Sequence, residues 1–406
     1  MTSRTPLFPR IRATVLATAV TTCLGAGLLA PATAAAAAPA AASASDSDRG
    51  PGHGAGHGTG HGRHAQPEVI AHRGASGYRP EHTLAAYELA VAQGADMIEP
   101  DVVATKDGVL VARHENEISG TTDVADHPEL ADRRTTKVID GRAVTGWFTE
   151  DLTLAELRTL RAVERLPEVR PGNTAYDGRY PVPTLEEVVE LAAELSEETG
   201  REIGVAPETK HPTYFDSIGL SLEEPLVELL DAHGLDDERD PVVVQSFEVG
   251  NLQELDELTD VRLVQLVDAA GAPYDLVAAG SDVTYDDLLT RGGLRWVARY
   301  ADQLAPHKDR VLPRDAAGAT GRPSSVVRDA HRAGLEVVVW TLRAEKQFMA
   351  TNFRVGTDPD AHGDLAAEAT AFLDAGVDVL FADHPDVVVA ARDAWVERRP
   401  GHGHGR

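Results

Sequence analysis

The sequence predicts an α/β fold, a TIM (β/α)8 barrel with a small insertion after the third strand. Short apolar runs alternate with amphipathic stretches over residues 68–396. Several of the amphipathic stretches stop at a glycine, which is typical of the left-handed cap at a helix C-terminus. Alternating strands and helices indicate right-handed βαβ units and a parallel sheet. Eight apolar runs suit a closed barrel better than an open sheet.

The elements follow in order along the chain. The expected strands are Val69–His72, Met97–Val103, Val109–Arg113, Ile203–Glu208, Val242–Phe247, Arg262–Val267, Glu336–Trp340 and Val377–Phe381. The expected helices are Thr83–Gln93, Leu185–Glu198, Leu222–His233, Asn251–Leu258, Ser324–Arg332 and Asp364–Asp374. Residues 115–182 interrupt this rhythm after the third strand, and 268–322 form a second irregular stretch. A segment as long as 115–182 is usually functional or a small inserted subdomain, and here it would cover the C-terminal face of the barrel.

Composition limits the classes of protein that the chain can belong to. The 406 residues are 42% hydrophobic, enough for a large core. Lys and Arg number 38 against 65 Asp and Glu, which gives a net charge of −27. That charge argues against a duplex nucleic-acid binder and against adsorption to anionic lipid. Phosphate-loop, dinucleotide and serine-elbow motifs do not occur, so nucleotide and serine-hydrolase chemistry lose their usual support.

Residues 1–36 are expected to be a cleaved signal peptide of the general secretory type. Three arginines precede an apolar and small-residue stretch, namely Arg4, Arg10 and Arg12 before Ala13–Leu29. A membrane anchor is the alternative, but the stretch is short for a span and poor in leucine. Lipid attachment at Cys23, the only cysteine, is disfavoured because neither Gly nor Ala directly precedes it. We therefore expect a secreted protein whose mature chain has no disulfide.

Residues 37–67 are predicted to be a disordered linker rich in Ala, Gly and His, and 397–406 a disordered tail that also contains histidines. The histidines are His53, His57, His61, His64, His402 and His404. Such tracts can bind transition metals. A metal-scavenging protein is therefore one alternative function, and it would depend on these tails.

Carboxylates gather where the expected strands end, which is where barrel enzymes place their sites. Glu99 and Asp101 are two residues apart, so a strand presents both on one face. Glu208 ends another strand. Three carboxylates repel one another unless a cation lies between them. Oxygen ligands suit Ca²⁺ or Mg²⁺, whereas Zn²⁺ would more often recruit His or Cys. A half-solvated strand face would be the purely structural explanation.

Histidines and cations complete the predicted site. His72 and His114 end the first and third expected strands, and two imidazoles can divide proton delivery and proton removal. Arg73 and Lys210 can hold phosphate oxygens, although they could instead pair with the carboxylates. Trp340 could cover the pocket or contact the substrate, or simply pack at the top of the barrel. The set indicates metal-assisted hydrolysis of a phosphodiester.

These residues stand in motifs that resemble the glycerophosphodiester phosphodiesterase family. The motifs are Ile70-Ala71-His72-Arg73-Gly74, Arg79-Pro80-Glu81-His82-Thr83, Ile98-Glu99-Pro100-Asp101-Val102, Thr105-Lys106-Asp107-Gly108, Arg113-His114-Glu115, Glu208-Thr209-Lys210, Gln245-Ser246-Phe247, Trp340-Thr341-Leu342-Arg343 and Phe381-Ala382-Asp383-His384-Pro385. They occur in order over about residues 68–393. The segment between residues 121 and 151 resembles the insertion of exported bacterial members. His82 departs from the family, which more often has Asn there.

The resemblance implies a hydrolase that converts glycerophosphodiesters to an alcohol and sn-glycerol 3-phosphate. The implied metal ligands are Glu99, Asp101 and Glu208, with Ca²⁺ usual in exported members and Mg²⁺ in some others. His72 and His114 would be the acid and the base, in either order, and Arg73 and Lys210 would contact phosphate. The attacking group could be water or, first, the glycerol hydroxyl of the substrate.

Two further alternatives keep part of this prediction. The same fold could act on a glycerol-phosphate wall polymer, or on lysophospholipid or sphingolipid in the manner of a phospholipase D. Intact lipids would favour an apolar rim, whereas the insertion is polar at residues 132–137. A phosphoester-binding protein without catalysis is the other alternative, but it would need neither His72 nor His114.

Overall fold

The computed structural model describes residues 66–359 and 361–399, all within one compact unit, Gly56–Arg406. The predicted signal peptide, nearly all of the predicted linker and most of the predicted tail lie outside the described residues. Within the described ranges, no helix has the length and apolar character needed to cross a membrane.

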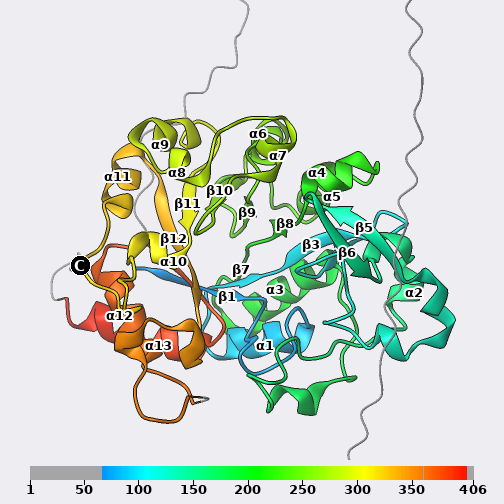
Figure 1. Ribbon diagram of the computed structural model, residues 1–406, viewed down its shortest axis with the longest axis horizontal. Coiled ribbons are helices and arrows are strands. Elements are labelled where there is room, and N and C mark those ends of the chain that lie inside the picture. Colours follow the sequence, from blue (N-terminus) through cyan, green and yellow to red (C-terminus); the bar gives the residue numbers. More distant parts are fainter. Residues whose placement is uncertain (1–65, 360, 400–406) are drawn as a thin grey trace, which may run out of the picture. The chain divides into compact units, whose positions relative to one another are not determined.

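Parallel strands close into a ring, so the predicted TIM barrel is confirmed (Figure 1). The ring consists of β1 (Glu68–His72), β2 (Met97–Glu99) continued by β3 (Asp101–Ala104), β7 (Gly204–Val205) continued by β8 (Glu208–Thr209), β9 (Val243–Ser246), β10 (Arg262–Val267), β11 (Gln303–Pro306), β12 (Glu336–Leu342) and β13 (Val379–Ala382). Because β1 pairs with both β2 and β13, the ring has no free edge. Pro100, which has no N–H to donate, separates β2 from β3.

Two of the strand predictions need correction. The expected strand Val109–Arg113 exists as β4 (Leu110–Ala112), but it pairs antiparallel with β3 outside the ring. Only residues 105–109 separate the two strands, which is too few for the crossover that a parallel pair requires. The eighth strand of the ring is β11, which we did not predict. It lies inside the stretch 268–322 that we expected to be irregular. Each of the other expected strands overlaps an observed one.

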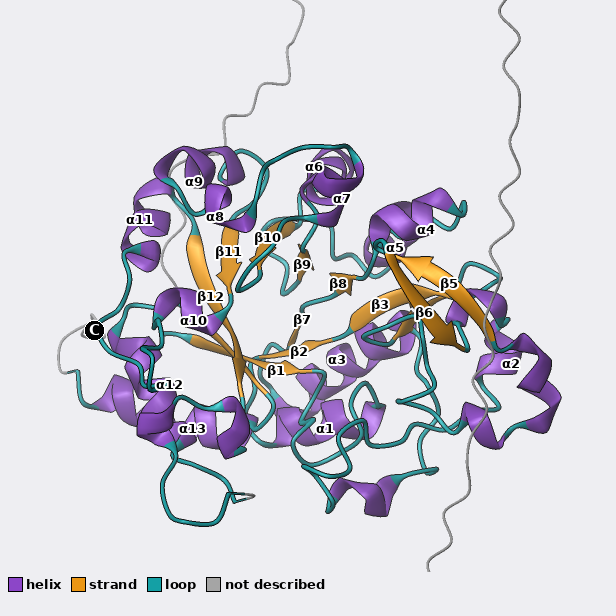
Figure 2. Cartoon of the chain, viewed as in Figure 1, coloured by secondary structure: helices purple, strands orange, loops and turns teal. Residues whose placement is uncertain are grey.

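Helices cover the outside of the ring (Figure 2). The α-helices are α1 (Leu84–Ala92), α2 (Leu154–Leu157), α3 (Leu185–Thr199), α4 (Pro212–Ser217), α5 (Glu223–Ala232), α6 (Val249–Leu258), α7 (Tyr274–Ala278), α8 (Tyr285–Leu288), α9 (Arg291–Val297), α10 (Lys308–Val311), α11 (Val326–Ala333), α12 (Leu365–Asp374) and α13 (Pro385–Glu397). All six expected helices are present. Thr184 begins α3 with a capping box, and Gly200 ends it at φ +65°, in the left-handed region that favours glycine.

The interior of the ring is filled by side chains from most of its strands and from the link between β7 and β8. They are Ile70, Met97, Ala206, Val243, Val264, Leu266, Ala305, Val338, Val379 and Phe381. Phe247 and Trp340 pack on this interior cluster. A second, larger core lies between the strands and the helices and continues into the insertion. The barrel is therefore a packed core and not a pore, and its strand ends are held rigidly.

The insertion between β4 and α3 contains defined structure. It carries the antiparallel hairpin β5 (Thr135–Ile139) and β6 (Arg142–Gly146), followed by α2. Its 3₁₀ helices are Val124–Asp126, Pro128–Arg133, Thr149–Asp151 and Asn173–Tyr176, and two more, Lys346–Phe348 and Thr351–Phe353, follow β12. Asp140 and Gly141 turn the hairpin with φ +47° and +74°, as a two-residue type I′ turn requires. We call β5, β6 and this turn the insertion hairpin.

Candidate active site

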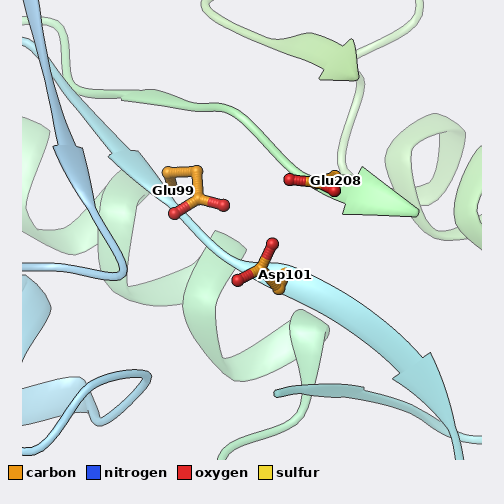
Figure 3. A group of neighbouring side chains, drawn as sticks. All are labelled: Glu99, Asp101 and Glu208. Carbon is orange, nitrogen blue, oxygen red and sulfur yellow. The ribbon is translucent and has the colours of Figure 1, made fainter. Parts of the chain in front are cut away.

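Three carboxylates meet where β2 passes into β3 and β7 passes into β8, on two neighbouring strands of the ring. Glu99 ends β2, Asp101 begins β3 and Glu208 begins β8, and the three side chains point toward one another (Figure 3). One oxygen of each lies within 4.8 Å of the others, and all three residues are buried. Asp101 and Glu208 are register partners on adjacent parallel strands, which brings them side by side. We call these residues the carboxylate trio.

The carboxylate trio fits a hard divalent cation. Asp101 Oδ1 is buried and has no hydrogen-bond partner among the residues that the structure describes. Burial, together with the charges of Asp101 and Glu208, raises the pKa of Glu99 well above its usual value. Burial raises the pKa of Glu208 to about 7. The charge of Lys210 opposes this rise, and the charge of Asp101 adds to it. A cation among these oxygens would relieve the repulsion, and an all-oxygen donor set suits Ca²⁺ or Mg²⁺.

His72 lies beside the trio at the end of β1. Its Nδ1 is 2.6 Å from Asp383 Oδ1, and its Nε2 accepts a hydrogen bond from Arg73 Nε at 3.2 Å. Burial and the charge of Arg73 lower the pKa of His72 to about 4, although Asp383 opposes them. The ring is therefore neutral, Nδ1–H donates to Asp383, and the lone pair is on Nε2.

His114 has the same kind of partners. Its Nδ1 is 2.9 Å from Glu115 Oε1, and its Nε2 is 3.3 Å from Lys210 Nζ. Desolvation, followed by the charges of Arg73 and Lys210, lowers the pKa of His114 to about 3. This residue follows β4 and not a ring strand. Because β4 runs antiparallel to β3, the chain returns to the level of Asp101, whose carbonyl accepts from Arg113 N at 2.9 Å.

Arg73 and Lys210 both contact the carboxylate trio. Arg73 Nε is 3.3 Å from Asp101 Oδ2, and its backbone N–H donates to Glu99 Oε2 at 2.7 Å. Arg73 Nη1 also contacts both carboxylate oxygens of Glu81 at 3.1 Å. Lys210 Nζ donates to Glu208 Oε1 at 2.7 Å. The salt bridges that we considered as the alternative for these cations therefore exist here, beside the positions where phosphate oxygens could bind.

The contacts of Trp340 are with the top of the barrel and not with the carboxylate trio. Its Nε1 donates to Ala305 O at 2.7 Å, and its ring meets the Phe247 ring edge-on at 5.5 Å between centroids. Phe247 in turn lies 5.6 Å from Lys210 Nζ. Trp340 thus packs at the top of the barrel, one aromatic ring away from the charged cluster.

Sequence reasoning missed the carboxylates that orient the two imidazoles. Asp383 follows β13, and it also accepts from Arg170 Nη2 at 2.5 Å and lies 3.0 Å from Arg343 Nε. Those two cations, outweighing burial, hold the pKa of Asp383 well below its usual value. Glu115 directly follows His114. The rule that strand ends carry function would have found Asp383 if the last strand had been extended by one residue, to Ala382.

His82 occupies the position where the sequence departs from the family pattern. Its Nε2 is 2.8 Å from Asp101 Oδ2, and its Nδ1 is 2.9 Å from the Tyr87 hydroxyl. Burial lowers the pKa of His82, so Nε2–H of the neutral ring donates to Asp101 while Nδ1 accepts from Tyr87. The residue has φ +55°, a conformation that both Asn and His tolerate better than most residues. His82 therefore leaves Asp101 Oδ1 available for a cation.

The fold and the site together define a TIM-barrel enzyme whose two imidazoles each contact a cation that pairs with a cluster of buried carboxylates. Residues 72–387 match the model of the glycerophosphoryl diester phosphodiesterase family, which is more than half of the chain. The chain belongs to this family of hydrolases.

Named relatives agree with the family match. A glycerophosphodiester phosphodiesterase of Arabidopsis thaliana is 33% identical over 331 residues, covering 79% of this chain and 84% of the relative. One from Haemophilus influenzae is 29% identical over 346 residues, covering 79% of this chain and 88% of the relative.

Solved structures share the fold. A glycerophosphoryl diester phosphodiesterase from Silicibacter pomeroyi superposes with a TM-score of 0.57 at 21% identity, covering 82% of this chain and 95% of that one. A phosphodiesterase from Oleispira antarctica, in complex with the product sn-glycerol-3-phosphate, gives 0.50 at 23% identity and covers 81% and 97%. At these identities the likeness supports the barrel architecture.

Proposed function

We propose that this protein hydrolyses glycerophosphodiesters to an alcohol and sn-glycerol 3-phosphate, using a divalent cation and two histidines. The observation that carries the proposal is the pair of carboxylate-oriented imidazoles, His72 and His114. Each imidazole contacts a cation, Arg73 or Lys210, that in turn contacts the carboxylate trio. The structure of the Oleispira antarctica relative with sn-glycerol-3-phosphate supports the product class.

The carboxylate trio would hold the cation, and Ca²⁺ is our first choice, with Mg²⁺ the alternative. When bound, the cation would supply positive charge that stabilises the phosphoryl oxygens. Arg73 and Lys210 would bind the other side of the phosphodiester. Each of them contacts the Nε2 of one imidazole. Phosphate oxygens that bind these cations would therefore free both Nε2 lone pairs.

The two imidazoles would then move the protons. One Nε2 removes the proton from the attacking hydroxyl, which belongs to water or, in a first step, to the glycerol of the substrate. The other ring, protonated at Nε2, gives its proton to the oxygen of the departing alcohol. The negative charge of the bound phosphodiester raises the pKa of a neighbouring imidazole, which favours the protonated form that this step needs. Asp383 and Glu115 keep Nδ1–H in place throughout.

The decisive experiment is a hydrolysis panel. Glycerophospho-choline, -ethanolamine, -glycerol and -inositol are each incubated with Ca²⁺, with Mg²⁺ and with excess chelator, and released sn-glycerol 3-phosphate is measured. We expect turnover that chelation abolishes and that added Ca²⁺ or Mg²⁺ restores. Full activity in excess chelator would exclude the role of the cation, and no release from any diester would exclude the substrate class.

Export is a separate part of the proposal. The arginines before an apolar stretch within residues 1–36 support a cleaved secretory signal and an extracellular enzyme of the exported bacterial type. Expression of the full chain, followed by N-terminal sequencing of protein from the medium, tests this. Intact residues 1–36 on cell-associated protein would contradict it.

A further inference from the structure

Glu115 holds two imidazoles at once. Its Oε1 lies 2.9 Å from His114 Nδ1, and its Oε2 lies 2.9 Å from Nε2 of His211. The other ring nitrogen of His211, Nδ1, lies 2.6 Å from Asp140 Oδ2 at the turn of the insertion hairpin. A continuous chain of polar contacts therefore runs from the inserted hairpin to the candidate catalytic imidazole, although residues 140 and 211 are far apart in sequence.

The geometry fixes the form of His211. A carboxylate accepts at each of its ring nitrogens, so both nitrogens carry a hydrogen and the ring is an imidazolium. Asp140 and Glu115, outweighing burial, raise the pKa of His211 to about 9, in agreement with this form. An imidazolium between two carboxylates is held by charge-assisted hydrogen bonds on both sides, which are stronger than neutral ones.

The backbone on both sides of this contact is unusual. His211 has φ +52° and Asp140 has φ +47°, both in the left-handed region. His211 directly precedes Pro212, the first residue of α4, so its ring is set at the start of a helix and not on a free loop. Figure 1 shows the insertion hairpin beside α4. The side chain is 16% exposed, whereas Glu115 is 49% exposed and needs an added partner to stay in one position.

We propose that His211 and Asp140 are positioning residues, which fasten the insertion hairpin to the mouth of the barrel and, through Glu115, fix the ring of His114. This inference rests on the proposed acid–base role of His114. In this arrangement Glu115 cannot rotate away, so His114 keeps its hydrogen on Nδ1 and its lone pair on Nε2.

The hairpin has other attachments, so a variant of the His211 contact should still fold. Glu150 Oε1, in the insertion, accepts from the Tyr214 hydroxyl at 2.6 Å and from Lys137 Nζ at 2.8 Å. Lys137 lies on β5 and Tyr214 on α4, so these contacts hold the same two elements together without His211. Asn is the replacement of choice at both test positions, because it tolerates positive φ and is too short at 211 to reach both carboxylates.

The test is a kinetic cycle in the full chain with glycerophosphocholine. We expect His211→Asn to lower kcat roughly tenfold with little change in KM, and Asp140→Asn to lower it less. In a His114→Ala background, His211→Asn should have no further effect, because its partner is absent. An equal loss in both backgrounds, or no loss in the first, would overturn the proposal. His331→Asn is the matched control, since it removes an imidazole–carboxylate contact of the same 2.6 Å length to Asp378, at the start of β13 and so at the opposite end of the barrel.

A spectroscopic measurement separates this proposal from the proposed function. In ¹⁵N-histidine-labelled protein, the ring nitrogens of His114 should show the Nδ1–H tautomer in the wild type and a mixture of tautomers in His211→Asn. This readout does not require turnover. If the wild type hydrolyses no glycerophosphodiester, the proposed function fails while the tautomer result still decides the role of His211. An unchanged tautomer in His211→Asn would overturn that role.

Discussion

His72 and His114 have equivalent sets of partners, but these partners come from different parts of the chain. Each ring places Nδ1 against a carboxylate and Nε2 against a cation. The His72 set belongs to the barrel, because its carboxylate, Asp383, follows the last ring strand. The carboxylate of the His114 set, Glu115, follows β4, which lies outside the ring. Glu115 is held in turn by His211, which contacts Asp140 of the insertion hairpin.

Burial separates the two sets further. The side chains of His72 and Asp383 are 10% and 2% exposed, whereas those of His114 and Glu115 are 28% and 49% exposed. A buried carboxylate must be fully paired, and Asp383 is, since two arginines contact it besides His72. The comparison teaches that one imidazole is fixed by a buried, fully paired carboxylate and the other by a more exposed one. Substitutions in the His72 set should therefore lower both stability and activity, whereas substitutions in the His114 set should lower mainly activity.

The largest expected effect is loss of either imidazole. His72→Ala and His114→Ala should each lower kcat by about 10²-fold or more, the scale of one general acid–base contribution. Turnover of glycerophosphocholine with the preferred cation measures this, and circular dichroism checks that each variant is folded. Near-normal turnover in either variant would end the acid–base role of that residue.

Removing the orienting carboxylates should distinguish the two sets. Asp383→Asn should lower kcat about tenfold to a hundredfold, and it should destabilise the fold by about 3 kcal/mol, because buried guanidinium groups lose their anion. Glu115→Gln should lower kcat by tenfold or less and leave the unfolding midpoint almost unchanged, because the carboxylate is half exposed. Urea unfolding with parallel kinetics tests both variants. If Asp383→Asn and Glu115→Gln destabilised the fold equally, the two carboxylates would not differ in their contribution to stability.

Arg73→Lys should reduce kcat/KM roughly tenfold despite its conservative appearance. The guanidinium simultaneously contacts His72, Asp101 and Glu81. One ammonium group cannot occupy these positions together, and a Lys at this point would also lose the planar fork that suits phosphate. Arg165→Lys is the matched control, because Arg165 contacts the same Glu81 from the insertion and is 31% exposed. Similar kinetics in both variants would argue against phosphate binding by Arg73.

Much of this comparison could be predicted from the sequence. Glu99, Asp101 and Glu208 could be placed together because side chains on a strand alternate and because parallel strands end at one face. His72 was found by the same rule. His114 was predicted for a wrong reason, because the strand that it follows, β4, lies outside the ring. It reaches the site because β4 runs antiparallel to β3 and leads the chain back beside Asp101.

The remaining features could not be found by that rule. The short strand β11 reads Gln303-Leu304-Ala305-Pro306, which has little β-propensity and ends in proline, so its apolar signal is weak. Asp140-Gly141 between two alternating runs is a strong hairpin signal, but the sequence analysis assigned no strands within residues 115–182. The contact of Asp140 with His211 depends on how the insertion packs on α4, and no local pattern specifies that.

The smallest expected effect concerns pH and the attachment of the hairpin. The folded-state pKa of His211 is raised to about 9 from 6.5, so the stability that it contributes is fully present below about pH 6.5 and is lost as the pH rises through 9. A neutral imidazole can donate to only one of Glu115 and Asp140, so the contact with the other weakens. The difference in urea midpoint between wild type and His211→Asn should therefore be largest near pH 6.5 and should narrow toward pH 10. A difference that is constant over this range, or that widens, would show that His211 is not held as an imidazolium between the two carboxylates.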